Sequence, residues 1–228
     1  LPTDVQFLLR QLNVEVTDIA EKERLIQTGQ KHYSEMLSAE PIPSAKHQQI
    51  YQHALDSYGL RMAQDIQALA LALLPLQVRG ELVLVSFVRA GVPIAVLLTR
   101  ALTAMGVCVM HYGISIVRDN GIDHHALNTI IQQHGVESII FVDGWTGKGA
   151  ISQELSRSLA QDSRFSGQPR LVTLADPCGH AWLAASAEDW LIPSGMLGAT
   201  VSGLVSRSLY HADDWHGCNS CTHLQDYD

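Results

Sequence analysis

Apolar residues recur at three- and four-residue steps over residues 50–73, and this spacing predicts one long amphipathic helix. The apolar stripe consists of Ile50, Ala54, Leu55, Tyr58, Met62, Ile66, Leu69 and Leu73. Pro75 ends the predicted helix, because proline has no backbone N–H to continue the hydrogen-bond ladder. Residues 1–45 are mixed and polar and close with the proline-marked loop EPIPS.

From residue 81 onward, short β-branched runs alternate with helical patterns. The strands predicted from these runs are 81–88, 107–117, 138–143 and 170–177. The predicted helices are 92–105, with Pro93 in its first turn, 126–134 and 150–160. Strands and helices that alternate with short connections are typical of a mainly parallel sheet with helices on both faces. We therefore expect an α/β fold.

Three polar loops follow predicted strands. They are VRAG (88–91), VRDNGID (117–123) and DGWTGKG (143–149). In open parallel sheets, ligands bind at the carboxyl ends of the strands, close to the point where the strand order reverses. We therefore expect the three loops to form one site.

The glycine loop within FVDGWTGKGAI, residues 141–151, has the composition of an anion-binding turn. Glycines let successive backbone N–H groups approach an anion, and the N-terminus of the following helix adds partial positive charge. The residues expected to hold a phosphate are Gly144, Thr146, Gly147, Lys148 and Gly149. The glycine spacing excludes both the Walker A and the dinucleotide-binding patterns. A strand-to-helix turn that binds no ligand is the alternative.

The other two loops offer arginines. Arg89 can donate two parallel hydrogen bonds to pyrophosphate oxygens, while Gly91 allows a tight backbone turn. The alternative is a helix-capping turn with a solvent-facing arginine. In the loop 118–123, Arg118 and the hinge residue Gly121 suit a mobile cover over a charged ligand, and the alternative is an ordinary polar connection.

Composition narrows the classes of function. The chain has 228 residues, 46% of them hydrophobic, which is enough for a substantial core. A net charge of −8 argues against a nucleic-acid surface, but a small anionic ligand needs only local positive charge. We expect no membrane partner and a cytoplasmic protein, because no apolar run spans a bilayer and the first residues lack signal-peptide features. The sequence leaves open a homodimer.

The sequences of these loops resemble those of known protein families. A hydrophobic strand that ends in Asp143 and leads into a Thr-Gly loop resembles the phosphoribosyl-diphosphate loop of type I phosphoribosyltransferases. Over nearly the whole chain, the segments HYSEML, VSFVRAGVPIAVLL, HYGISIVRDNGID, FVDGWTGKGAI, LADP and LIPSGMLGATVSGLVSR resemble a bacterial family. That family is described as phosphoribosyltransferase-like, is associated with tellurite-resistance and stress gene clusters, and carries the label cysteine protease StiP.

The resemblance implies phosphoribosyl transfer to an unknown acceptor, with catalytic roles for Asp143, Arg89 and Arg118. Asp143 would face the ribose, the glycine loop would hold the 5′-phosphate, and a magnesium ion would accompany the diphosphate. The loop of Arg89, Ala90 and Gly91 would take the pyrophosphate, and Arg118 would close over it. The transferases usually have two adjacent acids at this point, whereas Gly144 follows Asp143 here. A non-catalytic nucleotide or phosphoribosyl binder therefore remains the alternative.

The cysteines carry the second alternative, a cysteine peptidase, which needs a thiolate beside a histidine. Cys108 lies in a hydrophobic strand and is expected in the core. Cys178 has His180 two residues away, and Cys218 lies in HGCNSCTH near the end of the chain, so these two are the candidate nucleophiles. The same tail contains Cys221 and nearby histidines and could bind zinc. The alternative is an exposed tail without a bound metal.

The expected organisation has three parts. Residues 1–75 form an N-terminal helical hood segment, residues 76–190 form the α/β core in the phosphoribosyltransferase arrangement, and residues 191–228 form a C-terminal hood segment and tail. Residues 191–210 are interpreted as an edge strand and connection. The alternative for that segment places one of three side chains at the ligand: Ser202, Ser206 or Arg207.

Overall fold

A six-stranded sheet with the order β1-β4-β3-β7-β8-β9 forms the centre of the computed structural model, and every neighbouring pair in it is parallel. The structure describes residues 4–196, 198, 205–211 and 215–218. The strands of this sheet are β1 Gln6–Phe7, β3 Glu81–Phe87, β4 Cys108–Ile114, β7 Ile139–Val142, β8 Leu171–Ala175 and β9 Leu183–Ser186. The expected α/β fold with a parallel central sheet is confirmed.

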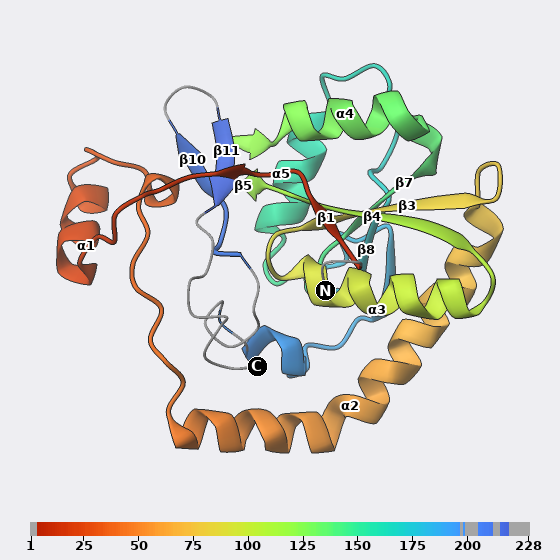
Figure 1. Ribbon diagram of the computed structural model, residues 1–228, viewed down its shortest axis with the longest axis horizontal. Helices are drawn as coiled ribbons and strands as arrows, with labels where there is room; N and C mark the ends of the chain where they lie inside the picture. Colours follow the sequence, from red (N-terminus) through yellow and green to blue (C-terminus); the bar gives the residue numbers. More distant parts are fainter. Residues whose placement is uncertain (1–3, 197, 199–204, 212–214, 219–228) are drawn as a thin grey trace.

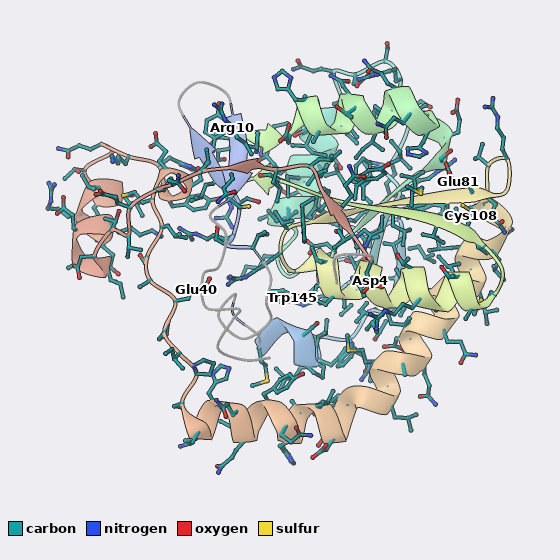
Figure 2. All side chains as sticks on the ribbon, viewed as in Figure 1. Asp4, Arg10, Glu40, Glu81, Cys108 and Trp145 are labelled. Atoms are coloured by element: carbon teal, nitrogen blue, oxygen red, sulfur yellow. The ribbon has the colours of Figure 1, made fainter. Side chains whose placement is uncertain are left out.

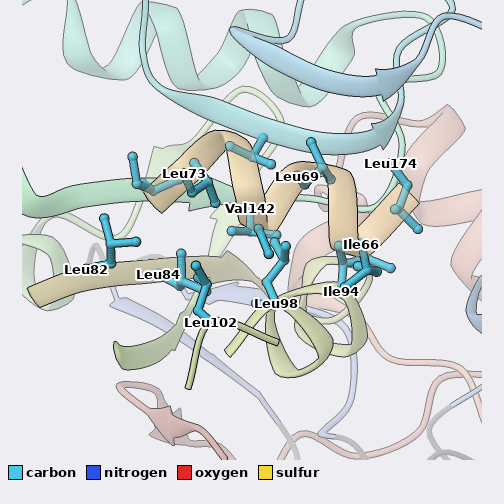
Figure 3. Close-up of a cluster of buried hydrophobic side chains, with 14 of the residues drawn as sticks. Ile66, Leu69, Leu73, Leu82, Leu84, Ile94, Leu98, Leu102, Val142 and Leu174 are labelled. Atoms are coloured by element: carbon cyan, nitrogen blue, oxygen red, sulfur yellow. The ribbon is translucent and has the colours of Figure 1, made fainter. Parts of the chain in front are cut away.

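Helices cover both faces of the sheet (Figure 1). The helices α2 (Ala45–Leu73) and α3 (Gly91–Ala104) pack on one face, and α4 (His124–His134) and α5 (Ala150–Leu159) pack on the other. Successive side chains of β3 point to opposite faces of the sheet and so contribute to two separate hydrophobic cores. Leu82 and Leu84 face α2 and α3 (Figure 3), whereas residues of the opposite parity face α4 and α5.

The strand order reverses between β3 and β7. From β3 the chain passes through α3 to β4 on one side, and later strands are added through α4 and α5 on the other side. The helix that follows β3 and the helix that follows β7 therefore lie on opposite faces of the sheet. The chain leaves the carboxyl ends of these two adjacent strands toward opposite faces, and this is where open α/β sheets form a ligand crevice.

The long helix α2 is confirmed, but in the first half of its predicted stripe only Ala54 is buried. Ile50, Leu55 and Tyr58 are 45%, 38% and 37% exposed, whereas the residues from Met62 to Leu73 in the stripe are buried. The reason is tertiary. The first half of α2 contacts the short 3-10 turn η4 (Pro193–Met196) instead of the sheet. The helix ends at Leu73, directly before the turn η2 (Leu74–Leu76) that contains Pro75.

Segments from both ends of the chain form a small second sheet with the order β10-β11-β2. Its strands are β2 Arg10–Gln11, β10 Leu209–His211 and β11 Trp215–Cys218, and α1 (Ile19–Gln27) and η1 (Tyr33–Glu35) follow β2. The expectation of an exposed tail is wrong for β11, because pairing with β2 and β10 buries Cys218 and His216. Cys221 and Ser202 lie outside the described residues. In residues 191–210 the described strand is only the start of β10, not an edge strand of the central sheet.

The second predicted strand is interrupted. β4 ends at Ile114, and β5 (Ile116–Val117) pairs with β6 (Gly121–Ile122) as a small hairpin. Asp123 then caps α4 through a bond from the backbone N–H of Ala126, and η3 (Val136–Ser138) leads into β7. Cys108, expected in the core, is exposed at the first position of β4. No helix in the described ranges is both long enough and apolar enough to cross a membrane.

Candidate functional site

The loops after β3 and β7 meet in direct contact. A Cβ atom on Gly91 would lie 2.3 Å from the carbonyl oxygen of Val142 and 3.2 Å from the Cα of Asp143. A Cβ atom on Gly144 would lie 3.3 Å from the carbonyl oxygen of Ala90. Glycine at position 91 is therefore required for the two backbones to approach each other. The sequence-predicted arginine loop and glycine loop share one place in the fold.

The glycine loop leads directly into α5. Gly147 and Gly149 have positive φ angles of 56° and 82°, and Gly149 is the N-cap residue of the helix. Within the described part of the chain, the backbone N–H groups of Ala150, Ile151 and Ser152 have no hydrogen-bond acceptor. They are the open donors that a helix N-terminus offers to an anion. The predicted phosphate turn thus has the geometry for that role, and the side chain of Lys148 is exposed beside it.

Asp176 organises this turn and was missed by the sequence reasoning. Its Oδ1 accepts a hydrogen bond from the hydroxyl of Thr146 at 2.7 Å, and its two carboxylate oxygens accept the backbone N–H groups of His180 and Ala181. Burial raises its pKa, but these hydrogen bonds outweigh burial and bring the pKa below the usual value. Thr146 therefore supplies its hydroxyl to Asp176. The available signal was the position of Asp176 directly after a buried strand.

Asp143 lies at the edge of a cavity of about 500 Å³ at the crevice. The carboxyl group is buried, and burial raises its pKa to about 7, although the N–H of Gly144 donates to its Oδ1 at 2.8 Å and lowers it. A buried carboxyl in a cavity with a pKa near neutrality is typical of a proton acceptor in catalysis. The side chains that line the rest of the cavity are mainly apolar and aromatic: Trp145, Ile151, Trp190, Leu191, Ile192 and Met196.

The aromatic wall of this cavity comes from two distant segments. Trp145, which is labelled in Figure 2, belongs to the glycine loop. Its exposed fraction is 47%. Trp190 is held from α2, because the guanidinium carbon of Arg61 lies 4.7 Å from its ring centroid and Tyr58 lies 6.0 Å away, centroid to centroid. The exposed half of the α2 stripe thus includes a residue that supports the cavity wall.

Arg89 contacts the N-terminal part of the chain. Its guanidinium forms an ion pair with the carboxylate of Glu40, and both side chains are about one quarter exposed. The peptide bond between Val88 and Arg89 is cis. The ion pair lies at a second cavity, of about 470 Å³, which Pro41, Ile42 and His47 also line. Sequence reasoning found Arg89 but not its partner, which is far from it along the chain.

Arg118 lies at the tip of the β5–β6 hairpin, and its side chain is exposed. Its backbone N–H donates to the hydroxyl of Tyr33 at 3.1 Å. The hairpin is also anchored on its other side, because the N–H of Asp119 donates to the buried carboxylate of Glu154 at 2.8 Å. The loop that was predicted to be a mobile cover is a short hairpin that is bonded to Tyr33 in the N-terminal part of the chain and to Glu154 in α5.

The two candidate nucleophiles lie in different places. Cys178 is half-buried, and its thiol donates to Oδ1 of Asp176 at 3.6 Å. A Cβ atom on Gly149 would lie 3.3 Å from the Sγ of Cys178 and 2.4 Å from the Nδ1 of His180, so both side chains face the phosphate turn. Cys218 is buried in the small sheet, and burial raises its pKa to about 11. Because the thiolate is the nucleophile, this environment argues against Cys218.

Comparisons with known proteins give similarities at two levels. A hypoxanthine phosphoribosyltransferase from Trypanosoma cruzi with IMP bound is 17% identical over 61% of this chain and 68% of its own, with a TM-score of 0.40. A structure described as an asparagine mutant at an invariant aspartic acid of HPRTs is 14% identical over 61% of this chain and 75% of its own, with a TM-score of 0.38. Scores this low do not establish a shared fold.

The sequence comparison is much stronger. A protein from Acinetobacter baylyi named cysteine protease StiP is 53% identical over 238 residues. The alignment covers 98% of this chain and 62% of the relative, so the chain spans less than two thirds of the relative's length. A family model described as "Tellurite-like stress resistance cysteine protease StiP" matches residues 1–228, and the chain belongs to this family.

Proposed function

We propose that the protein binds phosphoribosyl diphosphate at the crevice between β3 and β7 and transfers the phosphoribosyl group to an acceptor in the neighbouring cavity. One observation carries the proposal: a helix N-terminus with open N–H donors lies beside a buried carboxyl whose pKa is near 7, at the point where the strand order reverses. This combination suits an anionic substrate that reacts with a proton-releasing acceptor.

The binding roles follow from position. The N-terminus of α5 and Lys148 would hold the 5′-phosphate, since both offer positive charge to an anion. Asp143 lies at the start of the same loop, where β7 ends, and the ribose would extend toward it. The loop with Arg89 would receive the diphosphate, and the guanidinium fork matches its oxygen atoms.

The reaction would be a displacement at the anomeric carbon of the sugar. The bond from that carbon to the diphosphate oxygen breaks, and the diphosphate leaves with the electron pair. A bond from the carbon to the acceptor forms, and the acceptor's proton passes to the carboxylate of Asp143. The protein would contribute mainly by positioning the two reactants and by stabilising the negative charge that develops on the leaving group.

The cavity indicates the class of acceptor. Trp145 and Trp190 provide flat aromatic surface, and the other lining residues are mostly apolar, with Asp143, Asp189 and Ser194 as the polar ones. Flat heteroaromatic molecules stack on such surfaces, and those with an ionisable N–H can give a proton to Asp143. We therefore expect a heteroaromatic acceptor with an acidic N–H group.

A magnesium ion would enter with the diphosphate and neutralise part of its charge. Among the described residues, no group of three or more His, Cys, Asp and Glu side chains is arranged to hold a metal ion. An ion that is bound mostly by substrate oxygens and water does not require such a group, because magnesium retains its waters readily.

Release of pyrophosphate during turnover tests this proposal. The protein would be mixed with phosphoribosyl diphosphate, magnesium and a panel of purines, pyrimidines and other N–H heteroaromatics. If the protein transfers the phosphoribosyl group, the wild type should release pyrophosphate with at least one acceptor. The variant Asp143→Asn should not release it. Binding of phosphoribosyl diphosphate without release for any acceptor would instead favour a non-catalytic binder.

Peptide hydrolysis by Cys178 is a second candidate. It is favoured by the position of Cys178 and His180, which both face Gly149, and by the name of the Acinetobacter baylyi relative. Cleavage of a peptide library by the wild-type protein and its loss in Cys178→Ser would support this candidate. Unchanged cleavage in Cys178→Ser would exclude Cys178 as the nucleophile.

A further inference from the structure

Residues 32–43, which we call the strap, bridge several parts of the crevice. At one end, Tyr33 accepts the N–H of Arg118 from the β5–β6 hairpin. At the other end, Glu40 pairs with Arg89 at the end of β3 (Figure 2 labels Glu40). The strap therefore contacts both arginines that the sequence predicted for diphosphate binding.

A third arginine holds the middle of the strap. Nη2 of Arg207 donates to the carbonyl oxygens of Tyr33 and Met36, both at 3.0 Å, and its guanidinium lies 5.7 Å from the centroid of the Tyr33 ring. The next residue, Ser208, donates its hydroxyl to the carbonyl of Val88 at 3.3 Å. The residue after Arg207 is thus bonded to the residue directly before Arg89, which brings the backbones of the two arginines close together.

The charges of this cluster interact. Burial lowers the pKa of Arg207, and the positive charge of Arg89 lowers it further, whereas Tyr33 and Glu40 raise it. The two arginines belong to one charged cluster, because the Ser208–Val88 bond, the Glu40–Arg89 ion pair and the bonds from Arg207 to the strap link them, and the carboxylate of Glu40 offsets part of their positive charge. Such an arrangement favours an anion, and a diphosphate carries more negative charge than one carboxylate.

We propose that Glu40 occupies the diphosphate position on Arg89 in this state, that the diphosphate displaces it, and that Arg207 is the second guanidinium of the diphosphate site. This inference rests on the proposed function, which assigns the diphosphate to Arg89. The cavity of about 470 Å³ that Glu40 and Arg89 line provides space into which the Glu40 side chain can turn. Displacement of Glu40 makes the ion pair an internal competitor of the substrate.

Calorimetric titration with magnesium pyrophosphate tests the inference. Glu40→Gln removes the competing charge with little change in shape, and we expect it to bind pyrophosphate about tenfold more tightly than the wild type, which is the gain when a 90% populated closed state is removed. Arg207→Met should bind about tenfold more weakly. Arg207→Lys keeps the positive charge but loses the two-pronged guanidinium, so its affinity for pyrophosphate should lie between those of the wild type and Arg207→Met. This variant also shows whether weak binding by Arg207→Met results from a folding defect.

Glu21→Gln is the matched control, because it also removes one carboxylate from an ion pair with an arginine, at an exposed position on α1. Its affinity for pyrophosphate should equal that of the wild type. Equal or weaker binding in Glu40→Gln, or no binding by any variant, would overturn the inference.

Titration with phosphoribosyl diphosphate separates this inference from the proposed function. Tighter pyrophosphate binding in Glu40→Gln, without binding of phosphoribosyl diphosphate by any variant, would support the Arg89–Arg207 site and contradict the proposed function. Binding of phosphoribosyl diphosphate that is the same in the wild type and in Glu40→Gln would support the proposed function and contradict the role of Glu40 as a competitor.

Discussion

Thr146 donates its hydroxyl to Oδ1 of Asp176 at 2.7 Å, and this bond joins the glycine loop after β7 to the turn after β8. The partners are buried, so loss of one leaves the other without its hydrogen bond inside the protein. The same carboxylate fixes the backbone that carries Cys178 and His180. One carboxylate therefore positions both the phosphate turn and the candidate nucleophile.

Thr146→Val should loosen the phosphate turn. Because the carboxylate of Asp176 loses a buried donor, we expect the free energy of unfolding to fall by about 1–3 kcal/mol. The affinity for phosphoribosyl diphosphate should fall as well. Thr146→Ser keeps the hydroxyl and is the matched control. Chemical denaturation and calorimetry measure both effects, and equal behaviour of the two variants would show that the hydroxyl has no positioning role.

Asp143 should make the folded state less stable as the pH rises. Folding raises the pKa of its carboxyl from 3.8 to about 7, so the folded protein holds a proton that the unfolded chain has already lost. The stability contribution is therefore present below pH 4 and is lost as the pH rises to about 7, by up to about 4 kcal/mol.

Asp143→Asn removes this titration. Denaturation curves from pH 4 to pH 8 should show the variant gaining stability relative to the wild type as the pH rises. If the two proteins keep a constant difference over this range, the carboxyl of Asp143 does not have the raised pKa that the proposed proton transfer requires.

His111 should make the folded state less stable as the pH falls, which is opposite to the effect of Asp143. Its Nδ1 donates to the carbonyl of Asp4 at 2.8 Å, its Nε2 lies 2.8 Å from the hydroxyl of Ser86, and burial lowers its pKa from 6.5 to about 4. The neutral ring therefore stabilises the fold above pH 6.5, and this contribution, about 3 kcal/mol, is lost as the pH falls toward 4.

His111→Asn should remove the acid sensitivity at the contact between β1 and β4. As the pH falls from 7 to 4, the wild type should lose stability relative to this variant. Since His111 and Asp143 titrate in overlapping ranges with opposite signs, the wild-type curve should be flatter than that of either variant. A variant curve parallel to that of the wild type would contradict the role of His111.

Cys178→Ser should leave pyrophosphate release unchanged to within about twofold, because serine can donate to Asp176 as the thiol does and Cys178 is not part of the proposed transfer chemistry. Steady-state rates measure this. A loss of transfer above tenfold, together with a loss of peptide cleavage, would place Cys178 in the reacting centre and favour the peptidase.

The local structure of the candidate site was predictable where its residues are close in sequence. A strand, an acid, a glycine turn and a helix lie within residues 139–159, and their local chemistry indicates an anion site without knowledge of the fold. Gly91 was also identified, but for the wrong contact. Its missing Cβ makes room for the end of β7, which no local pattern can show.

The residues that sequence reasoning missed act across long separations. Asp176 lies 30 residues from Thr146, and Glu40 lies 49 residues from Arg89, so their pairing depends on the completed fold. The stripe on α2 fails for a related reason. Periodicity shows which face of a helix is apolar, but it does not show how far the sheet extends beneath that face.

Calorimetric titration of phosphoribosyl diphosphate with magnesium, beside AMP, ATP and inorganic phosphate, tests the central claim most directly. We predict magnesium-dependent binding that is tightest for phosphoribosyl diphosphate. It should weaken at least about 100-fold when Lys148→Met and Thr146→Val are combined, because the charge and the turn geometry are both lost. Lys31→Met, which removes an exposed lysine elsewhere, should bind normally. No binding by the wild type, or equal binding by the double variant, would contradict the assignment of the crevice between β3 and β7.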